Sequence, residues 1–142
     1  MSENRLLLAN IGEQKLAFPV CEIFDVINTP KMTRVPLSEE YILGILNLRG
    51  KVITVICLSR FLGINSNPIN KNAIIIHDKN DAYCFCVDFI GEVLDYEDSD
   101  FKLLPSTLSD QWGGLIMDVI PEENSMILRI NVEELMKRLI SA

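Results

Sequence analysis

The sequence has little that could hold it in a membrane or carry it out of the cell. Its longest largely apolar runs, residues 52–58 and 74–76, are far shorter than the roughly 18 residues that a bilayer-spanning helix needs. The first residues also lack a secretory signal, because only residues 6–9 could form its apolar segment. We therefore expect a cytoplasmic protein that does not insert into a membrane.

Basic residues are scarce as well. The chain has 13 lysines and arginines against 20 aspartates and glutamates, which gives a formal net charge of -7. Its longest basic run is Lys137-Arg138. Because a negatively charged surface repels phosphate backbones, this composition excludes nucleic acid as a partner.

Motifs for catalysis and for cofactors are missing too. The sequence contains no GxGxxG, no Walker A loop and no HExxH. The single histidine, His77, ends an apolar stretch beside Asp78 without the spacing of a catalytic triad. Cys84 and Cys86 could form a metal or redox pair, but a zinc site normally needs a second such pair or more histidines. We expect no catalytic residue, no metal and no cofactor, and we expect all four cysteines to be free, buried thiols.

What is present is a series of short apolar stretches separated by Gly, Pro, Asn and Asp, which is typical of small β-barrels. The predicted strands are residues 6–9, 15–20, 22–27, 51–58, 73–77, 82–88, 90–96, 115–120 and 125–130. A short helix is expected to begin at Ser38, with Tyr41, Ile42 and Ile45 as its apolar stripe. A second helix, residues 132–140, closes the chain behind the cap Asn131.

A polar, proline-containing linker at residues 65–72 suggests a boundary between two subdomains. We expect a first barrel subdomain at residues 1–66 and a second one, with the closing helix, at residues 67–142. Strands and the helix are allowed to exchange between the two.

The most specific feature is residues 43–50, LGILNLRG, followed by a β-branched run and then by LSRFLG at residues 58–63. This arrangement resembles CheW-like domains, in which a GxxNLRG turn precedes an apolar strand and a DLxxxLG segment. Cys57 stands where the family usually carries the aspartate. The resemblance continues through FPV at 18–20, IFDV at 23–26, TRVP at 33–36, VDFIGEVL at 87–94 and ILRINVEEL at 127–135.

This resemblance implies a mainly β fold of two five-stranded SH3-like barrels with exchanged strands. It also implies a non-catalytic scaffold that couples a chemoreceptor cytoplasmic tip to the regulatory domain of a chemotaxis histidine kinase. That regulatory domain is itself CheW-like in the family, so contacts between barrels and assembly into rings with the kinase are expected.

The resemblance also suggests which residues make these contacts. Those expected to contact or support the receptor are Ile23, Gly44, Asn47, Arg49, Gly50, Ile90 and Val93. Those expected to contact the kinase are Leu37, Val52 and Thr54. Asp25 is the candidate partner of Arg49 in a structural ion pair beside the docking groove. For Ile23, Ile90 and Val93, burial inside a barrel is an equal alternative, because the sequence does not show which strand face points inward.

Two other functions stay open at this point. A CheW-like adaptor of a type IV pilus or gliding system would bind through the same kind of surface contacts but to different receptors. A small β-barrel enzyme or ligand-binding protein would need converging polar groups, for which only His77, Cys84, Cys86 and Asp88 can be nominated.

Overall fold

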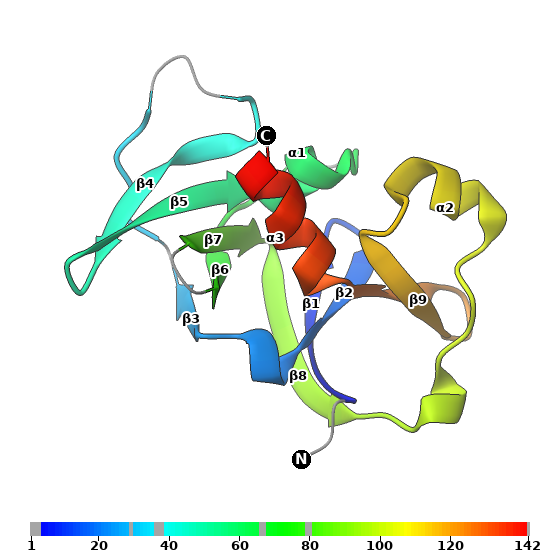
Figure 1. The fold of residues 1–142 in the computed structure, drawn as a ribbon. Helices are drawn as coiled ribbons and strands as arrows, with labels where there is room; N and C mark the ends of the chain where they lie inside the picture. The colour runs from blue at the N-terminus through cyan, green and yellow to red at the C-terminus, as the bar shows by residue number, and fades with distance from the viewer. Residues whose placement is uncertain (1–3, 29, 36–38, 66–67, 79–80, 142) are drawn as a thin grey trace.

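The structure is a computed structural model that describes residues 4–28, 30–35, 39–65, 68–78 and 81–141. In this part of the chain, two five-stranded sheets and several short helices form the fold (Figure 1). The apolar, often β-branched stretches fold as strands because such side chains pack well on a pleated surface. The predicted class, mainly β with two five-stranded units, is confirmed.

Sheet A combines both ends of the chain. Its strands lie in the order β8 (Phe89–Asp95), β1 (Arg5–Ile11), β2 (Gln14–Pro19), β10 (Met126–Ile130) and β9 (Ile116–Pro121). Neighbouring strands are antiparallel except β2 and β10, which are parallel. The last two strands therefore complete a sheet that the first two begin.

Sheet B is built from consecutive strands in the middle of the chain. Their order is β3 (Asp25–Asn28), β6 (Asn72–Asp78), β7 (Asp81–Val87), β5 (Lys51–Cys57) and β4 (Ile42–Leu48). Here β5 and β7 are the parallel pair. Both sheets take strands from either side of residues 66 and 67, so strands are exchanged between the two halves. The division into subdomains 1–66 and 67–142 stays a prediction.

Within the described ranges, five short helical segments connect or cover the strands. They are η1 (Val20–Glu22), α1 (Leu58–Leu62), η2 (Asp98–Asp100), α2 (Ser106–Trp112) and α3 (Val132–Ser141). The predicted closing helix is confirmed as α3, and Asn131 caps it by accepting a hydrogen bond from the Glu134 backbone N–H at 3.1 Å. In the described residues, no helix is both long and apolar enough to cross a membrane.

The hydrophobic core has a central part and two outer parts. The central core lies between the sheets and includes Phe18 of sheet A, Phe85 of sheet B and Leu135 of α3, which crosses between the two halves (Figure 1). Each sheet also has an outer core on its other face. We call them core A, with Leu6, Ala17, Ile120 and Ile127, and core B, with Leu46, Ile53, Val55, Ala73, Ile75, Cys84 and Cys86. Burial on both strand faces explains why residues 55–57 of β5 and 74–76 of β6 are continuously apolar.

The prediction of a short helix before the NLRG turn was wrong. Residues 42–48 form strand β4, which pairs with β5 along its length. The backbone of Thr33 also pairs with Ile45, through N–H to O distances of 2.7 and 2.8 Å. These strand pairings outweigh the local helical pattern, because helix propensity is a weak signal beside tertiary contacts. Ser38, the expected helix cap, lies outside the described residues.

The cysteine prediction holds for three of the four residues. Cys57, Cys84 and Cys86 are free and buried, whereas Cys21 is free but exposed. Cys21 lies in η1, a single helical turn at the surface that has no buried residue. An apolar neighbourhood in the sequence therefore did not guarantee burial at this position.

Candidate docking surfaces

The NLRG segment forms the tight turn between β4 and β5. Leu48 pairs with Lys51, so Arg49 and Gly50 are the two loop residues. Both have positive φ, 53° for Arg49 and 81° for Gly50, as in a type I′ hairpin turn. The Asn47 side chain fixes the turn, because its Oδ1 accepts a hydrogen bond from the Gly50 N–H at 3.0 Å. The hairpin therefore presents Arg49 at its tip from a constrained backbone.

Position 44 requires glycine for a packing reason that the motif alone does not reveal. A Cβ atom at this position would lie 2.3 Å from the backbone oxygen of Thr33. Such a contact is impossible without moving the backbone, so only glycine lets residues 33 and 45 pair across it. Gly44 is buried and supports the hairpin rather than offering a side chain to a partner.

The structure does not bring Asp25 and Arg49 together. Among the described residues, no ion pair joins them. Asp25 lies on edge strand β3, and its carboxylate accepts a hydrogen bond from the neighbouring Val26 N–H at 2.8 Å. Arg49 instead lines the same pocket as Phe24, the residue before Asp25.

Arg49 lines a pocket of about 180 Å³ at one end of core B, which we call the Phe24 pocket. Its lining residues are Phe24, Leu48, Arg49, Lys51, Ile53, Ile75, His77 and Ala82. They come from β4, its turn, β5, β6, β7 and the segment before β3, so the sequence separates them by up to 58 positions. Phe24 is 47% exposed, although it belongs to this apolar lining.

A second pocket adjoins the first across Phe24 and His77. These two rings pack edge to face, with their centroids 4.5 Å apart. The second pocket, of about 200 Å³, is lined by Cys21, Glu22, Ile23, Phe24 and His77. Ile23 and Arg49, both predicted receptor residues, therefore lie on opposite sides of one aromatic pair. Phe24 and His77 were not predicted for this surface, because neither belongs to the NLRG motif.

Two of the three predicted kinase residues lie on the same hairpin. Val52 pairs directly with Asn47 and is 62% exposed, and Thr54 follows two residues later on the same face of β5. Asn47 is also exposed, so a predicted receptor residue and a predicted kinase residue stand side by side. Leu37 lies outside the described residues.

The remaining predicted receptor residues lie on β8, an edge strand of sheet A. Val93 pairs with Leu7 and is 50% exposed, whereas Ile90 pairs with Ala9 and packs partly against the central core. The register shifts between these two pairs, as in a β-bulge. Of the three residues for which burial was the alternative, Val93 is exposed, whereas Ile23 and Ile90 are half-buried.

The residues nominated for an enzyme or ligand site do not come together. Cys84 and Cys86 lie in core B, where a hydrogen bond between them, and then burial, raises the pKa of the Cys84 thiol. His77 is exposed beside Phe24. Within the described ranges, no group of three or more His, Cys, Asp or Glu residues could hold a metal ion.

Asp88 instead links the two sheets. Its buried carboxylate accepts hydrogen bonds from the backbone N–H groups of Gly12, at 2.7 Å, and Ile69, at 2.9 Å. Its backbone carbonyl accepts a third bond from the side chain of Asn72 at 2.9 Å. These partners belong to the β1–β2 turn, to the connection before β6 and to β6 itself. Asp88 therefore has a structural role.

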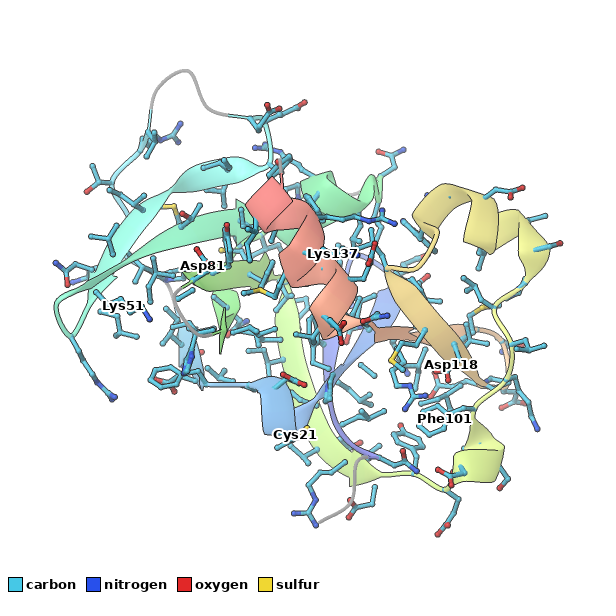
Figure 2. All side chains as sticks on the ribbon, in the orientation of Figure 1. Cys21, Lys51, Asp81, Phe101, Asp118 and Lys137 are labelled. Carbon is cyan, nitrogen blue, oxygen red and sulfur yellow. The ribbon has the colours of Figure 1, made fainter. Side chains whose placement is uncertain are left out.

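Charge is distributed unevenly between the two sheets. Residues 20–87, which include all of sheet B, carry seven basic and six acidic side chains, whereas the rest of the chain carries six basic and fourteen acidic ones. In the described part, the ion pairs are Arg5–Asp95, Lys15–Glu122, Arg129–Asp118 and Arg138–Glu134, all of them on sheet A or α3. Figure 2 shows Lys51 in the half that sheet B forms, and Phe101 and Asp118 in the other.

Comparisons with known proteins agree on one family. The model of the CheW-like domain matches residues 5–139. The chemotaxis protein CheW of Thermotoga maritima is 29% identical over 140 residues, which is 98% of this chain and 91% of that protein. The chemotaxis protein CheW of Helicobacter pylori is 28% identical over 130 residues, or 90% of this chain and 78% of that protein.

A solved structure agrees with the fold. The crystal structure of the scaffolding protein TtCheW from Thermoanaerobacter tengcongensis matches with a TM-score of 0.77 at 22% identity, and the match covers 91% of this chain and 89% of that one. The family match extends over both sheets, the NLRG hairpin and most of α3. The chain therefore belongs to the CheW-like domain family.

Proposed function

We propose that this chain is a non-catalytic cytoplasmic scaffold that couples chemoreceptors to a chemotaxis histidine kinase through protein–protein contacts. The observation that carries the proposal is the family match across residues 5–139. The relatives named above are chemotaxis and scaffolding proteins. The dispersal of the nominated polar residues agrees with a function based on surfaces rather than on a reactive group.

The receptor surface, in this proposal, is formed by Ile23, Asn47, Arg49, Ile90 and Val93. Gly44 and Gly50 act through the backbone, the first by allowing a close contact and the second by adopting a positive φ. Half-exposed apolar side chains beside an arginine are typical of protein interfaces, where such residues contribute much of the binding energy.

The kinase surface comprises Leu37, Val52 and Thr54. Val52 supports this assignment because a valine that is 62% exposed on a regular strand gains little from folding and much from a partner that covers it. Since Val52 stands opposite Asn47 on the same face of the hairpin, receptor and kinase would contact neighbouring positions of one short element. A rigid hairpin in that position could transmit a displacement directly from one partner to the other. Repeated contacts of this kind with the kinase would also allow ring assembly.

A reconstitution tests the coupling function. The purified chain is mixed with a chemoreceptor cytoplasmic tip and a histidine kinase, and kinase autophosphorylation is measured with and without the chain. We expect receptor control of the kinase only when the chain is present. Receptor control that is equal without the chain would refute the proposal.

Two substitutions test the assigned surfaces. We expect Val52→Asp to weaken kinase binding by about tenfold or more, because it places a charge in an apolar contact. Receptor binding should change little. The control is Met117→Asp, which charges a similarly exposed apolar residue on β9 of sheet A. Equal losses from both variants would show that the effect is not specific to the hairpin.

A further inference from the structure

Core B is open at one end, whereas core A is covered. The apolar side chains of Leu48, Ile53, Ile75 and Ala82 form the floor of the Phe24 pocket, and all four belong to core B or its partly buried border. On core A, Tyr96 and Phe101 pack over the apolar residues, and the Arg129 guanidinium lies 3.8 Å from the centre of the Phe101 ring. The two outer cores therefore differ in what covers them.

The size of the Phe24 pocket suits one large side chain. An apolar cavity of about 150 Å³ is large enough to hold a benzene ring. The pocket, at about 180 Å³, has room for one aromatic or long aliphatic side chain. Phe24 and His77 form one wall of the pocket as an edge-to-face pair.

The rim of the pocket is basic, and none of its lining residues is acidic. Arg49 and Lys51 both line it, and neither forms an ion pair within the described residues. The two cations flank Gly50, so the hairpin turn holds them on either side of one position. Cations that are free of internal partners are available to carboxylates of another molecule.

The backbone at Arg49 adds an independent observation. Its φ of 53° is a conformation that asparagine and glycine adopt far more easily than arginine. The turn would thus be more stable with another residue. Strained positions of this kind are concentrated at ligand and partner contacts.

We propose that the Phe24 pocket receives a bulky apolar side chain carried on an acidic segment of a partner protein, with Arg49 and Lys51 pairing with carboxylates on either side of it. The inference rests on the proposed function, because it specifies the chemistry of the partner that reaches Arg49. Apolar contact with the floor supplies affinity, and the two cations select for acidic neighbours.

Short peptides test the chemistry directly on the full chain. The probe is a blocked peptide with one phenylalanine between two pairs of glutamates, and chemical shifts of the labelled chain are followed by NMR. We expect the largest shifts at Phe24, Ile53, His77 and Ala82. A matched peptide with alanine in place of phenylalanine, and one with lysines in place of glutamates, should each bind at least about tenfold more weakly.

Variants of the chain complete the test. Arg49→Asn keeps a favourable residue for the type I′ turn but removes the cation, and Lys51→Gln removes the second one. Each substitution should weaken binding of the acidic peptide by about three- to tenfold, and this loss of affinity should be smaller at high salt. Ala82→Leu should block binding by filling the pocket. Lys102→Gln, which removes an exposed lysine outside residues 20–87, is the matched control and should leave binding unchanged.

Three outcomes of the binding experiments would overturn the inference, and the coupling assay provides a fourth. One is equal binding of the acidic and basic peptides, and another is a shift pattern centred away from the pocket. The third is self-association of the chain that the same variants abolish, because the occupant would then be a second copy. The coupling assay separates the two proposals. If receptor control of the kinase persists in Arg49→Asn and Ala82→Leu, the pocket assignment fails while the scaffold function stands.

Discussion

The two sheets share a strand count and an order of pairing but differ in how their charges are used. On sheet A and α3, lysines and arginines pair with acidic residues, and Arg129 lies over an aromatic ring at the border of core A. On sheet B, Arg49 and Lys51 line an open pocket and have no ion-pair partner in the described residues. Cations in ion pairs are therefore concentrated in the half in which charge supports the fold, whereas Arg49 and Lys51 line the pocket that we assign to recognition.

This contrast has a physical basis. A cation that is paired and partly covered contributes to the stability of its own chain, because removing it leaves the partner carboxylate without its main contact. A cation without an ion-pair partner contributes almost nothing to the stability of its own chain. It is therefore available to pair with a carboxylate of another molecule. Sheets of similar topology can thus be specialised by a few side chains, and substitutions at those side chains should separate the two uses of charge.

The largest expected effect comes from breaking the link between the halves. Asp88→Ala removes a buried carboxylate that holds backbone N–H groups of Gly12 and Ile69. Because hydrogen bonds to charged groups contribute about 1.5–3 kcal/mol each, we expect the free energy of unfolding to fall by roughly 3 kcal/mol. Urea denaturation measures this loss, and Asp110→Ala, at an exposed position of α2, is the control. A loss equal to that of the control would contradict the role of Asp88.

The next effect should be confined to sheet A. Arg129 forms two hydrogen bonds to the Asp118 carboxylate, at 2.7 and 2.5 Å, and both side chains are more than 80% covered. We expect Arg129→Ala to lower the free energy of unfolding by about 2 kcal/mol, because it leaves that carboxylate unpaired and also removes the contact with Phe101. Thermal unfolding followed by circular dichroism is a sufficient measurement. If the melting temperature of the variant equals that of the original protein, the contrast between the two sheets is contradicted.

Replacing an arginine on sheet B should change the free energy of unfolding in the opposite direction. We expect Arg49→Asn to raise the free energy of unfolding by up to about 1 kcal/mol, because asparagine adopts positive φ more readily than arginine. Receptor control of the kinase should nevertheless decrease. The measurement pairs urea denaturation with the autophosphorylation assay, and Arg60→Asn, which removes an exposed arginine from helix α1, is the control. A large loss of stability in Arg49→Asn would place Arg49 among the structural cations.

The smallest effect concerns the pH dependence of sheet A. The hydrogen bond from Lys15, together with a weaker one from Ser125, lowers the pKa of Glu122 below its ordinary value of 4.5. A lowered pKa in the folded state means that this contribution is complete above pH 4.5 and is lost as the pH falls through the lowered pKa. We expect Glu122→Gln to cost about 0–1 kcal/mol near neutral pH and nothing in strong acid, because the pair is partly exposed. Melting curves of both proteins from pH 3 to pH 7 would show the two lines converge in acid, and parallel lines would contradict the assignment.

Much of the fold could be predicted from the sequence, because apolar stretches and turn residues alternate along most of the chain. The strands, the closing helix with its cap Asn131 and the family all follow from local pattern. The segment 42–48 was one exception, and helix α2 was not predicted either. The apolar spacing of segment 42–48 suited a helix, and only pairing with β5 and with Thr33, which lies outside the segment, made it a strand.

The candidate site was less predictable, because periodicity shows which residues share a strand face but not which strands meet. Arg49 could be nominated from the NLRG motif, but the Phe24 pocket needs Phe24, His77 and Ala82 from three separate elements. The burial of Ile23, Ile90 and Val93 depends on which core each strand face meets. No motif indicates that the Asp25 carboxylate accepts a hydrogen bond from the Val26 N–H, or that no ion pair joins Asp25 to Arg49 among the described residues.

The distribution of strands along the chain also bears on how the protein is made. All five strands of sheet B lie within residues 25–87, with no strand of sheet A between them. They are therefore all synthesised before β8. β1 and β2 are synthesised before the other strands but need β8, β9 and β10, so their apolar faces must wait until residue 130 has been synthesised. Because long-range pairing is slow and leaves strand edges open, we expect that sheet B forms first and that the early β1–β2 hairpin is the segment most dependent on chaperones.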